Sequence, residues 1–227
     1  MSSDIHHRRS IRLQGYNYAQ AGAYFVTICT QNRECLFGEV VDGAMILNDA
    51  GRMVEAIWDR LSDRFPFIEL DQFGVMPNHV HGIIVLTGRR PTSGNHPPST
   101  PGDHKDRPYR ISAAPGDHED RPYKVHGTLE GTVGRVIQGF KSITIYEYVV
   151  GVRRHEWRPF EGRLWQRNYY EHIIRDEDSL HHIREYIATN PLRWELDREN
   201  PQRTGEDEFD RWLAEQSHGL KKRSKKM

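Results

Sequence analysis

The N-terminal part of the chain alternates between short apolar runs and polar breaks. Four of the runs are rich in aromatic and β-branched residues, which favours β-strands. They cover Ala23–Thr30, Leu36–Val41, Ile68–Met76 and His79–Leu86. We expect the first two to form a hairpin with its turn near Gln31–Glu34. The last two predict a second hairpin around the break at Pro77-Asn78.

Other segments place apolar side chains at helical spacing on one face. The helices that this spacing predicts cover residues 48–61, 129–143 and 176–190. Asn48 and Asp176 are favourable N-caps for the first and the third. Pro191 ends the third, because the residue before a proline disfavours helical geometry. A last strand is expected at Leu164–Ile174, ahead of the third helix.

This order of elements predicts the α+β class. A succession of two strands, a helix, two strands, a helix, a strand and a helix gives an antiparallel sheet with helices packed on it. The pattern resembles a ferredoxin-like sandwich that has gained an N-terminal hairpin strand and a C-terminal helix. The last helix carries the candidate catalytic residue Tyr186.

We expect one domain at residues 1–200, followed by a charged, basic-ended C-terminal tail at residues 201–227. Within the domain, residues 87–127 are dominated by Pro, Gly, Ser, His and charged side chains, and contain the near-repeats PGDHKDRPYR and PGDHEDRPYK. Two short copies are too few for a solenoid. The segment is therefore predicted to be a disordered insertion in a surface loop.

Composition excludes some classes of protein and favours few. The net charge is zero, with 32 basic and 32 acidic residues, so a strongly basic nucleic-acid binder is not indicated. Basic residues do gather at both ends of the chain, where they could contact phosphates. No apolar run approaches the ~20 residues of a membrane helix. Two isolated cysteines and no apolar leader favour a cytoplasmic protein.

The most informative pair of residues is His79 and His81. Successive side chains of a strand alternate between faces, so these two point the same way while Val80 points into the core. Two imidazoles on one face can share one divalent ion. Taken alone, the pattern fits a metal site and two polar residues on a sheet face about equally well.

Tyr186 and Asn190 are four residues apart and lie on the same side of the last helix. Singly, each has an ordinary structural role, as a half-buried core tyrosine and a C-terminal cap. A helix packed on the sheet could instead bring both over the histidine pair. The site would then hold two imidazoles, one amide oxygen and one phenol.

That set suits attack on a phosphodiester. A divalent ion stabilises the charge that develops on the phosphate oxygens, and a tyrosine nucleophile yields a covalent phosphotyrosine. The stored phosphate bond lets a later 3′-hydroxyl reverse the step and rejoin strands. The base that takes the phenolic proton is not identifiable from the sequence.

Several motifs in the same order resemble the HUH-type single-tyrosine transposases, and within them the REP-associated tyrosine transposases. They are GAYFVTICTQNRECLFGEV, VMPNHVHGIIV, FKS at 140–142 and LWQRNYYEHIIRDEDSLHHIREYIATNP. The resemblance runs from about Arg8 to Trp194, apart from the insertion. In that family the letters HUH denote two histidines around a hydrophobic residue, here His79 and His81.

The resemblance implies a ferredoxin-like fold, a Mg²⁺ or Mn²⁺ ion, and binding of a DNA hairpin with cleavage of the adjacent single strand. It implies His79 and His81 as metal ligands, Tyr186 as the nucleophile that forms a 5′-phosphotyrosine, and Asn190 as a residue that can complete the metal site. A REP-like hairpin in single-stranded DNA is the implied partner, and both a monomer and a homodimer are compatible.

Three basic residues are candidates for phosphate contact: Arg12, Lys141 and Arg167. Tyr169 and Tyr170, in the last strand, are rival nucleophiles.

Two alternative functions stay open at this point. The first is a non-catalytic or domesticated protein that binds single-stranded DNA or an RNA hairpin, since sheets of this type with aromatic residues also bind single strands. The second is a zinc hydrolase, which needs a third strong ligand. His172 could supply it if it faces the histidine pair.

Overall fold

The computed structural model describes residues 20–88 and 131–223. Arg12 and the greater part of the predicted insertion at 87–127 lie outside the described residues. Within the described part, no helix is long and apolar enough to cross a membrane.

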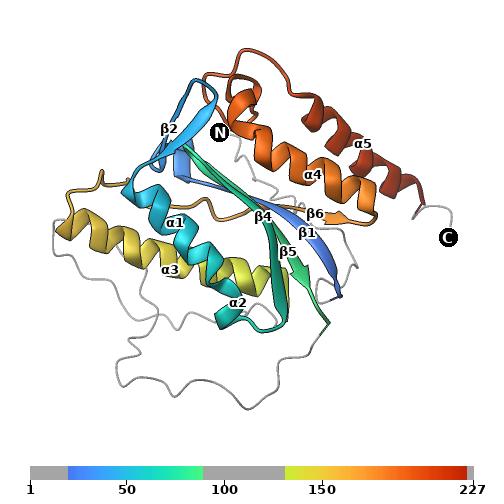
Figure 1. The fold of residues 1–227 in the computed structure, drawn as a ribbon, viewed down its shortest axis with the longest axis horizontal. Helices are drawn as coiled ribbons and strands as arrows, with labels where there is room; N and C mark the ends of the chain where they lie inside the picture. The colour runs from blue at the N-terminus through green and yellow to red at the C-terminus, as the bar shows by residue number, and fades with distance from the viewer. Residues whose placement is uncertain (1–19, 89–130, 224–227) are drawn as a thin grey trace, which may run out of the picture.

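A four-stranded antiparallel sheet forms the centre of the molecule (Figure 1). Its strands are β1 (Gly22–Cys29), β4 (Ile68–Met76), β5 (His79–Leu86) and β6 (Tyr170–Ile174). They are arranged in the order β4-β5-β1-β6, with one helical connection between β1 and β4 and another between β5 and β6. This is the ferredoxin-like arrangement, so the predicted α+β class is confirmed.

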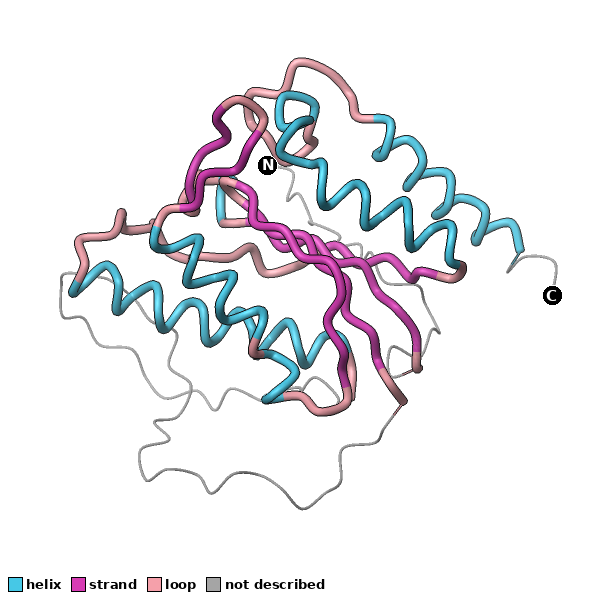
Figure 2. The backbone as a smooth tube through the Cα atoms, in the orientation of Figure 1, coloured by secondary structure: helices cyan, strands magenta, loops and turns pink. Residues whose placement is uncertain are grey.

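Helices lie on both sides of the sheet (Figures 1 and 2). One side carries α1 (Asp49–Asp59), α2 (Leu61–Arg64) and α3 (Val133–Arg154). The other side carries α4 (Glu177–Thr189), the 3-10 helix η2 (Asn190–Leu196) and α5 (Glu208–Arg223). The sheet therefore separates two hydrophobic clusters, one on each face.

Because side chains alternate between the two faces along β5, this strand contributes residues to both clusters. Val80 and Ile84 belong to the larger cluster beneath α1 and α3, where Trp58 is also buried. Ile83 points the other way and packs with Phe25 in the smaller cluster beneath α4 and α5. Both faces are thus covered, which explains why the strand reads as a nearly continuous apolar run.

The segment Leu36–Val41 does not pair with β1, contrary to the sequence prediction. Instead β2 (Gly38–Val41) pairs with β3 (Ala44–Leu47) in a separate two-stranded sheet. Asp42 and Gly43 form the turn, with φ values of 50° and 75°. Two consecutive positive φ angles are the mark of a tight type I′ hairpin, for which Asp-Gly is a favoured pair.

Other boundaries also differ from the expectation. The last strand is shorter than Leu164–Ile174, and Trp165 makes only an isolated bridge to Thr30. The second predicted helix begins later and continues to Arg154. A short 3-10 helix, η1 (Gln31–Arg33), occupies the predicted turn after β1.

The predicted caps are confirmed. Asn48 accepts a hydrogen bond from the amide of Gly51, and Asp176 accepts one from the amide of Ser179.

Helix α4 is fixed to the edge strand β4 by a charged contact. Between Leu70 and Phe73 the register of β4 against β5 shifts by one residue, which marks a β-bulge. Asp71 lies in this bulge and accepts hydrogen bonds from Arg184 Nε and Nη2 at 2.8 and 2.6 Å. Because Arg184 stands two residues before Tyr186, the contact sets the position of the tyrosine helix.

We expect Asp71→Asn to lower the free energy of unfolding by about 1–2 kcal/mol, since a partly buried bidentate pair is lost. The Arg184 hydrogen bond lowers the pKa of Asp71, so the pair stabilises the fold above the ordinary aspartate pKa and loses its effect as pH falls through the lowered value. Urea denaturation at several pH values measures this. Asp49→Asn, which breaks an exposed pair with Arg52, should change the stability by no more than about 0.5 kcal/mol. Equal effects of the two variants would contradict the assignment.

Candidate functional site

His79 and His81 lie at the start of β5 and point to the face that α4 covers. His79 is fully buried and His81 is 3% exposed. Their Nε2 atoms lie 2.9 Å apart. Burial lowers the pKa of His79 and lowers that of His81 well below its ordinary value, so both rings are neutral near neutral pH.

The other ring nitrogens have partners in the surrounding structure. Asn78 donates through Nδ2 to two backbone carbonyls, the nearer being that of Glu199 at 2.8 Å. Its Oδ1 is therefore the atom that faces His79 Nδ1, at 2.8 Å. It follows that His79 carries its hydrogen on Nδ1 and presents a lone pair on Nε2. His81 Nδ1 lies 3.0 Å from Thr27 Oγ1, a hydroxyl that can donate or accept.

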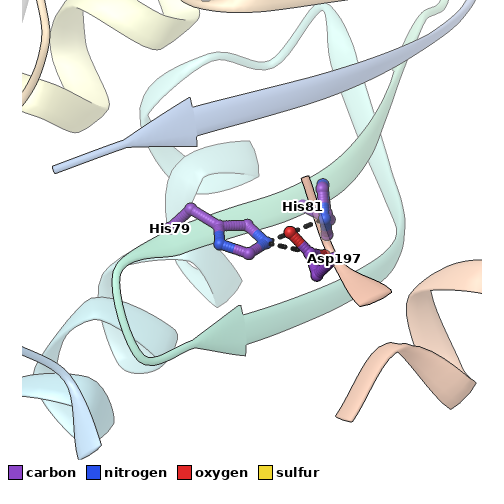
Figure 3. A group of neighbouring side chains, drawn as sticks. All are labelled: His79, His81 and Asp197. Carbon is purple, nitrogen blue, oxygen red and sulfur yellow. Dashed lines mark hydrogen bonds and ion pairs between the residues drawn. The ribbon is translucent and has the colours of Figure 1, made fainter. Parts of the chain in front are cut away.

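Asp197 adds a carboxylate to the pair. It caps the C-terminus of η2, and its Oδ2 lies 3.8 Å from His79 Nε2 (Figure 3). The backbone amide of Glu199 donates to its Oδ1 at 2.6 Å, which fixes the side chain. One ligand atom from each of His79, His81 and Asp197 lies within 4.8 Å of the others.

Helix α4 brings Tyr186 to this group, as the sequence predicted. Its hydroxyl donates to Asp197 Oδ2 at 3.3 Å and lies 3.4 Å from His81 Nε2. Its ring stacks on Phe209 of α5, with ring centroids 3.6 Å apart and an interplanar angle of 6°. Burial, followed by the charge of Asp197, raises the pKa of Tyr186 well above its ordinary value. The phenol is therefore protonated in this arrangement.

Asn190 also reaches the group. Its Nδ2 donates to Asp197 Oδ2 at 2.7 Å. Its Oδ1 is buried and has no hydrogen-bond partner among the described residues. A buried amide oxygen without a partner costs free energy, which a cation ligated at that atom would offset.

The donor set fits a divalent cation. Neutral imidazole nitrogens with a carboxylate oxygen are ligands for Mn²⁺ and Zn²⁺, and the amide oxygen suits the harder Mg²⁺ and Mn²⁺. Two imidazole lone pairs at 2.9 Å repel one another unless a hydrogen or a cation lies between them. His79, His81 and Asp197 would hold the ion, with Asn190 as a fourth candidate.

Two of the three predicted phosphate contacts, Lys141 and Arg167, lie elsewhere. Lys141 Nζ donates to the backbone carbonyls of Gln166, Arg167 and Asn168, at 2.7, 3.4 and 3.2 Å. Its burial lowers the pKa of the ammonium group to about 8. Lys141 thus holds the loop before β6 in place, and Arg167 is exposed on that loop. Contact of either residue with a phosphate stays a prediction.

The rival residues are not part of the group. The Tyr169 hydroxyl donates to Glu171 at 2.9 Å. The Tyr170 ring lies 5.2 Å from the guanidinium of Arg198. His172, the expected third ligand of a zinc hydrolase, lies 6.2 Å from the ring of Trp212, measured between ring centroids. The third residue of the cluster is Asp197 instead.

Sequence reasoning missed Asp197. Its position depends on the direction in which the chain leaves η2. No regular spacing in the sequence relates Asp197 to His79 or Tyr186, so the sequence does not predict their proximity. The only available signal was the presence of three carboxylates, Glu195, Asp197 and Glu199, shortly after the Asn190-Pro191 step.

The fold and the site define an α+β domain with a buried His-His-Asp group beside a tyrosine. No protein-family model matches the sequence. The chain belongs to the same family as a Haemophilus influenzae protein that bears the name "Uncharacterized protein". The two are 41% identical over 197 residues, which is 87% of this chain and 95% of the relative.

Two solved structures resemble the fold. One is a REP-associated tyrosine transposase bound to a REP hairpin, with a TM-score of 0.46, 16% identity, and coverage of 81% of this chain and 74% of that chain. The other is a candidate transposase from Deinococcus radiodurans, with a TM-score of 0.37, 15% identity, and coverage of 78% and 95%. At such low identities neither assigns an activity to this chain.

We expect the protein to bind one Mn²⁺ per chain, and His81→Ala to weaken binding by more than about 100-fold, because losing a direct ligand exceeds the 10–100-fold effect of losing an outer partner. Asp197→Asn should also weaken it. Electron paramagnetic resonance of free Mn²⁺ measures the affinity, and competition with Zn²⁺ tests the hydrolase alternative. His181→Ala, on the exposed face of α4, is the control. Unchanged affinity in a folded His81→Ala protein would exclude this metal site.

Proposed function

We propose that the protein is a metal-dependent single-strand DNA endonuclease of the transposase type, which cleaves and rejoins DNA next to hairpins through a 5′-phosphotyrosine at Tyr186. The observation that carries the proposal is the position of the Tyr186 hydroxyl, within 3.4 Å of both His81 and Asp197. A tyrosine that served only the hydrophobic core would have no need of a metal-binding group at its hydroxyl.

The reaction is balanced by groups in this chain. Tyr186 Oη attacks the phosphorus, the bond from phosphorus to the 3′-oxygen breaks, and that oxygen takes up a proton to leave as a 3′-hydroxyl. The acceptor within reach of the phenolic proton is the carboxylate of Asp197, because Nε2 of His81 would give its lone pair to the ion. Asp197 is therefore a candidate for the base that the sequence did not reveal.

A divalent ion held by His79, His81 and Asp197 would supply charge stabilisation at the phosphate oxygens. The protein supplies the rest. Hydrogen bonds to Asn78 and Thr27 hold the two histidine rings in place, so the reaction needs no further free energy to orient them. Before DNA enters, Phe209 and the surrounding apolar side chains keep water away from the ring of Tyr186.

The test is to mix single-stranded DNA rich in hairpins and labelled at its 3′ end, the part that a 5′-phosphotyrosine retains, with the wild-type protein and with Tyr186→Phe. Each is incubated with Mn²⁺ and with EDTA, then run on a denaturing protein gel. We expect a labelled protein band that needs Mn²⁺ and is lost in Tyr186→Phe, because phenylalanine keeps the ring packing and removes only the nucleophilic oxygen.

The matched controls are Tyr169→Phe and Tyr170→Phe, which should keep the band. A band that survives Tyr186→Phe and disappears in either control would move the nucleophile to the last strand. DNA binding in a gel shift without any covalent band would favour the non-catalytic hairpin-binding protein.

A further inference from the structure

The C-terminal helix α5 covers the site. It lies beside α4 (Figure 1), and its Phe209 stacks face to face on the ring of Tyr186. Leu213 is buried in the same cluster. Tyr186 is only 3% exposed as a result. A polynucleotide phosphate can reach the hydroxyl only if α5 moves away from α4.

The covering segment carries the wrong charge for a polyanion to approach. Residues 206–216, which lead into α5 and form its first part, contain five acidic side chains and one arginine. Like charges in a partly buried environment repel with little screening by salt. The segment therefore opposes phosphate in the same place where the proposed reaction needs it.

Two ion pairs connect this acidic segment to the rim of the site. Arg193 Nη1 lies 3.2 Å from Asp207 Oδ1, and its guanidinium carbon is 5.5 Å from the centre of the Tyr186 ring. Arg198 Nη1 lies 3.7 Å from Asp210 Oδ1. Arg193 lies in η2, and Arg198 lies two residues beyond the end of that helix and is paired with Glu199 at 2.9 Å, so both arginines belong to the side of the site and not to α5.

The two acids are poorly accommodated in this arrangement. Asp207 is 2% exposed, and its Oδ2 is buried with no hydrogen-bond partner among the described residues. Burial raises the pKa of Asp210 to about 6. Both carboxylates thus lose their hydration when α5 docks, and the ion pairs and hydrogen bonds in the protein compensate for only part of that loss. The acidic segment is therefore held less firmly.

We propose that Arg193 and Arg198 are phosphate-binding residues, and that single-stranded DNA displaces Asp207 and Asp210 from them as α5 leaves Tyr186. A guanidinium matches phosphate geometry as well as it matches a carboxylate. The exchange lets one set of cations serve both the covered and the DNA-bound forms. This inference rests on the proposed function for its partner, but it requires no chemistry at Tyr186.

The experiment measures binding of a fluorescent single-stranded oligonucleotide in EDTA, on a Tyr186→Phe background, by anisotropy at several salt concentrations. Asp207→Asn/Asp210→Asn should bind at least about tenfold more tightly, since two repelling charges and two tethers are lost; that equals about 1.4 kcal/mol. Arg193→Gln/Arg198→Gln should bind more weakly, with a salt slope shallower by about 1.4 for two lost phosphate contacts.

The arginine variant separates two explanations. If Arg193 and Arg198 served only to hold the cover, their replacement would release α5 and tighten DNA binding. A tighter or unchanged affinity of this variant therefore overturns the proposal. Asp59→Asn/Asp63→Asn and Arg60→Gln/Arg64→Gln make the same charge changes on exposed positions of the opposite helical layer and should bind like the parent.

The outcomes also separate this inference from the proposed function. Normal covalent labelling together with unaltered binding by the arginine variant would remove the inference alone. Arginine-dependent binding without labelling would keep the inference and favour a non-catalytic binding protein. No detectable binding of single-stranded DNA by the parent protein would overturn both.

Discussion

Two neutral imidazoles buried side by side on the central strand are the constraint on which the rest of the site depends. Burying a polar group without a partner costs several kcal/mol, so each ring nitrogen of His79 and His81 needs one. Asn78 and Thr27 satisfy the two Nδ1 atoms. The two Nε2 atoms face one another, and only a shared hydrogen or a cation satisfies them both. The other polar groups of the site, from α4 and η2, gather around that point.

The ferredoxin-like arrangement explains how these groups meet. Strand β5 lies inside the sheet between β4 and β1, so a side chain on it can be fully buried on either face. The even-numbered side chains of β5 pack against the layer of α1 and α3. Its odd-numbered side chains, which include both histidines, therefore face the layer of α4 and α5. The kink from α4 into η2 at Asn190 then turns the chain back, and Asp197 returns to the tyrosine that lies eleven residues earlier.

Local pattern was enough to predict the parts of the site that depend on one element. Strand alternation gave the common direction of His79 and His81, and helical spacing gave that of Tyr186 and Asn190. Asp197 was beyond reach because its place depends on a tertiary turn after η2. The predicted pairing of Leu36–Val41 with the first strand was wrong although a local signal was present. Asp42-Gly43 is a favoured hairpin turn, but the prediction instead joined the two apolar runs that are neighbours in the sequence. The covering role of α5 depends on docking, which charge-rich sequence alone does not reveal.

Asp197 belongs to the candidate metal group and also precedes the acidic segment that leads into α5. The point at which the chain opens therefore decides whether that group stays intact. Its Oδ1 is held by the amide of Glu199, and its Oδ2 by Asn190 and Tyr186. The partners in these hydrogen bonds all precede residue 200, so they lie before the stretch that leads into α5. Residues 200–207 contain no regular element, and α5 beyond them is held by the buried side chains of Phe209 and Leu213, with the ion pairs of Asp207 and Asp210 at its start. Opening between these points would remove α5 and leave Asp197 in place. The ligand group can therefore persist while the tyrosine becomes accessible, so metal binding and DNA entry need not compete.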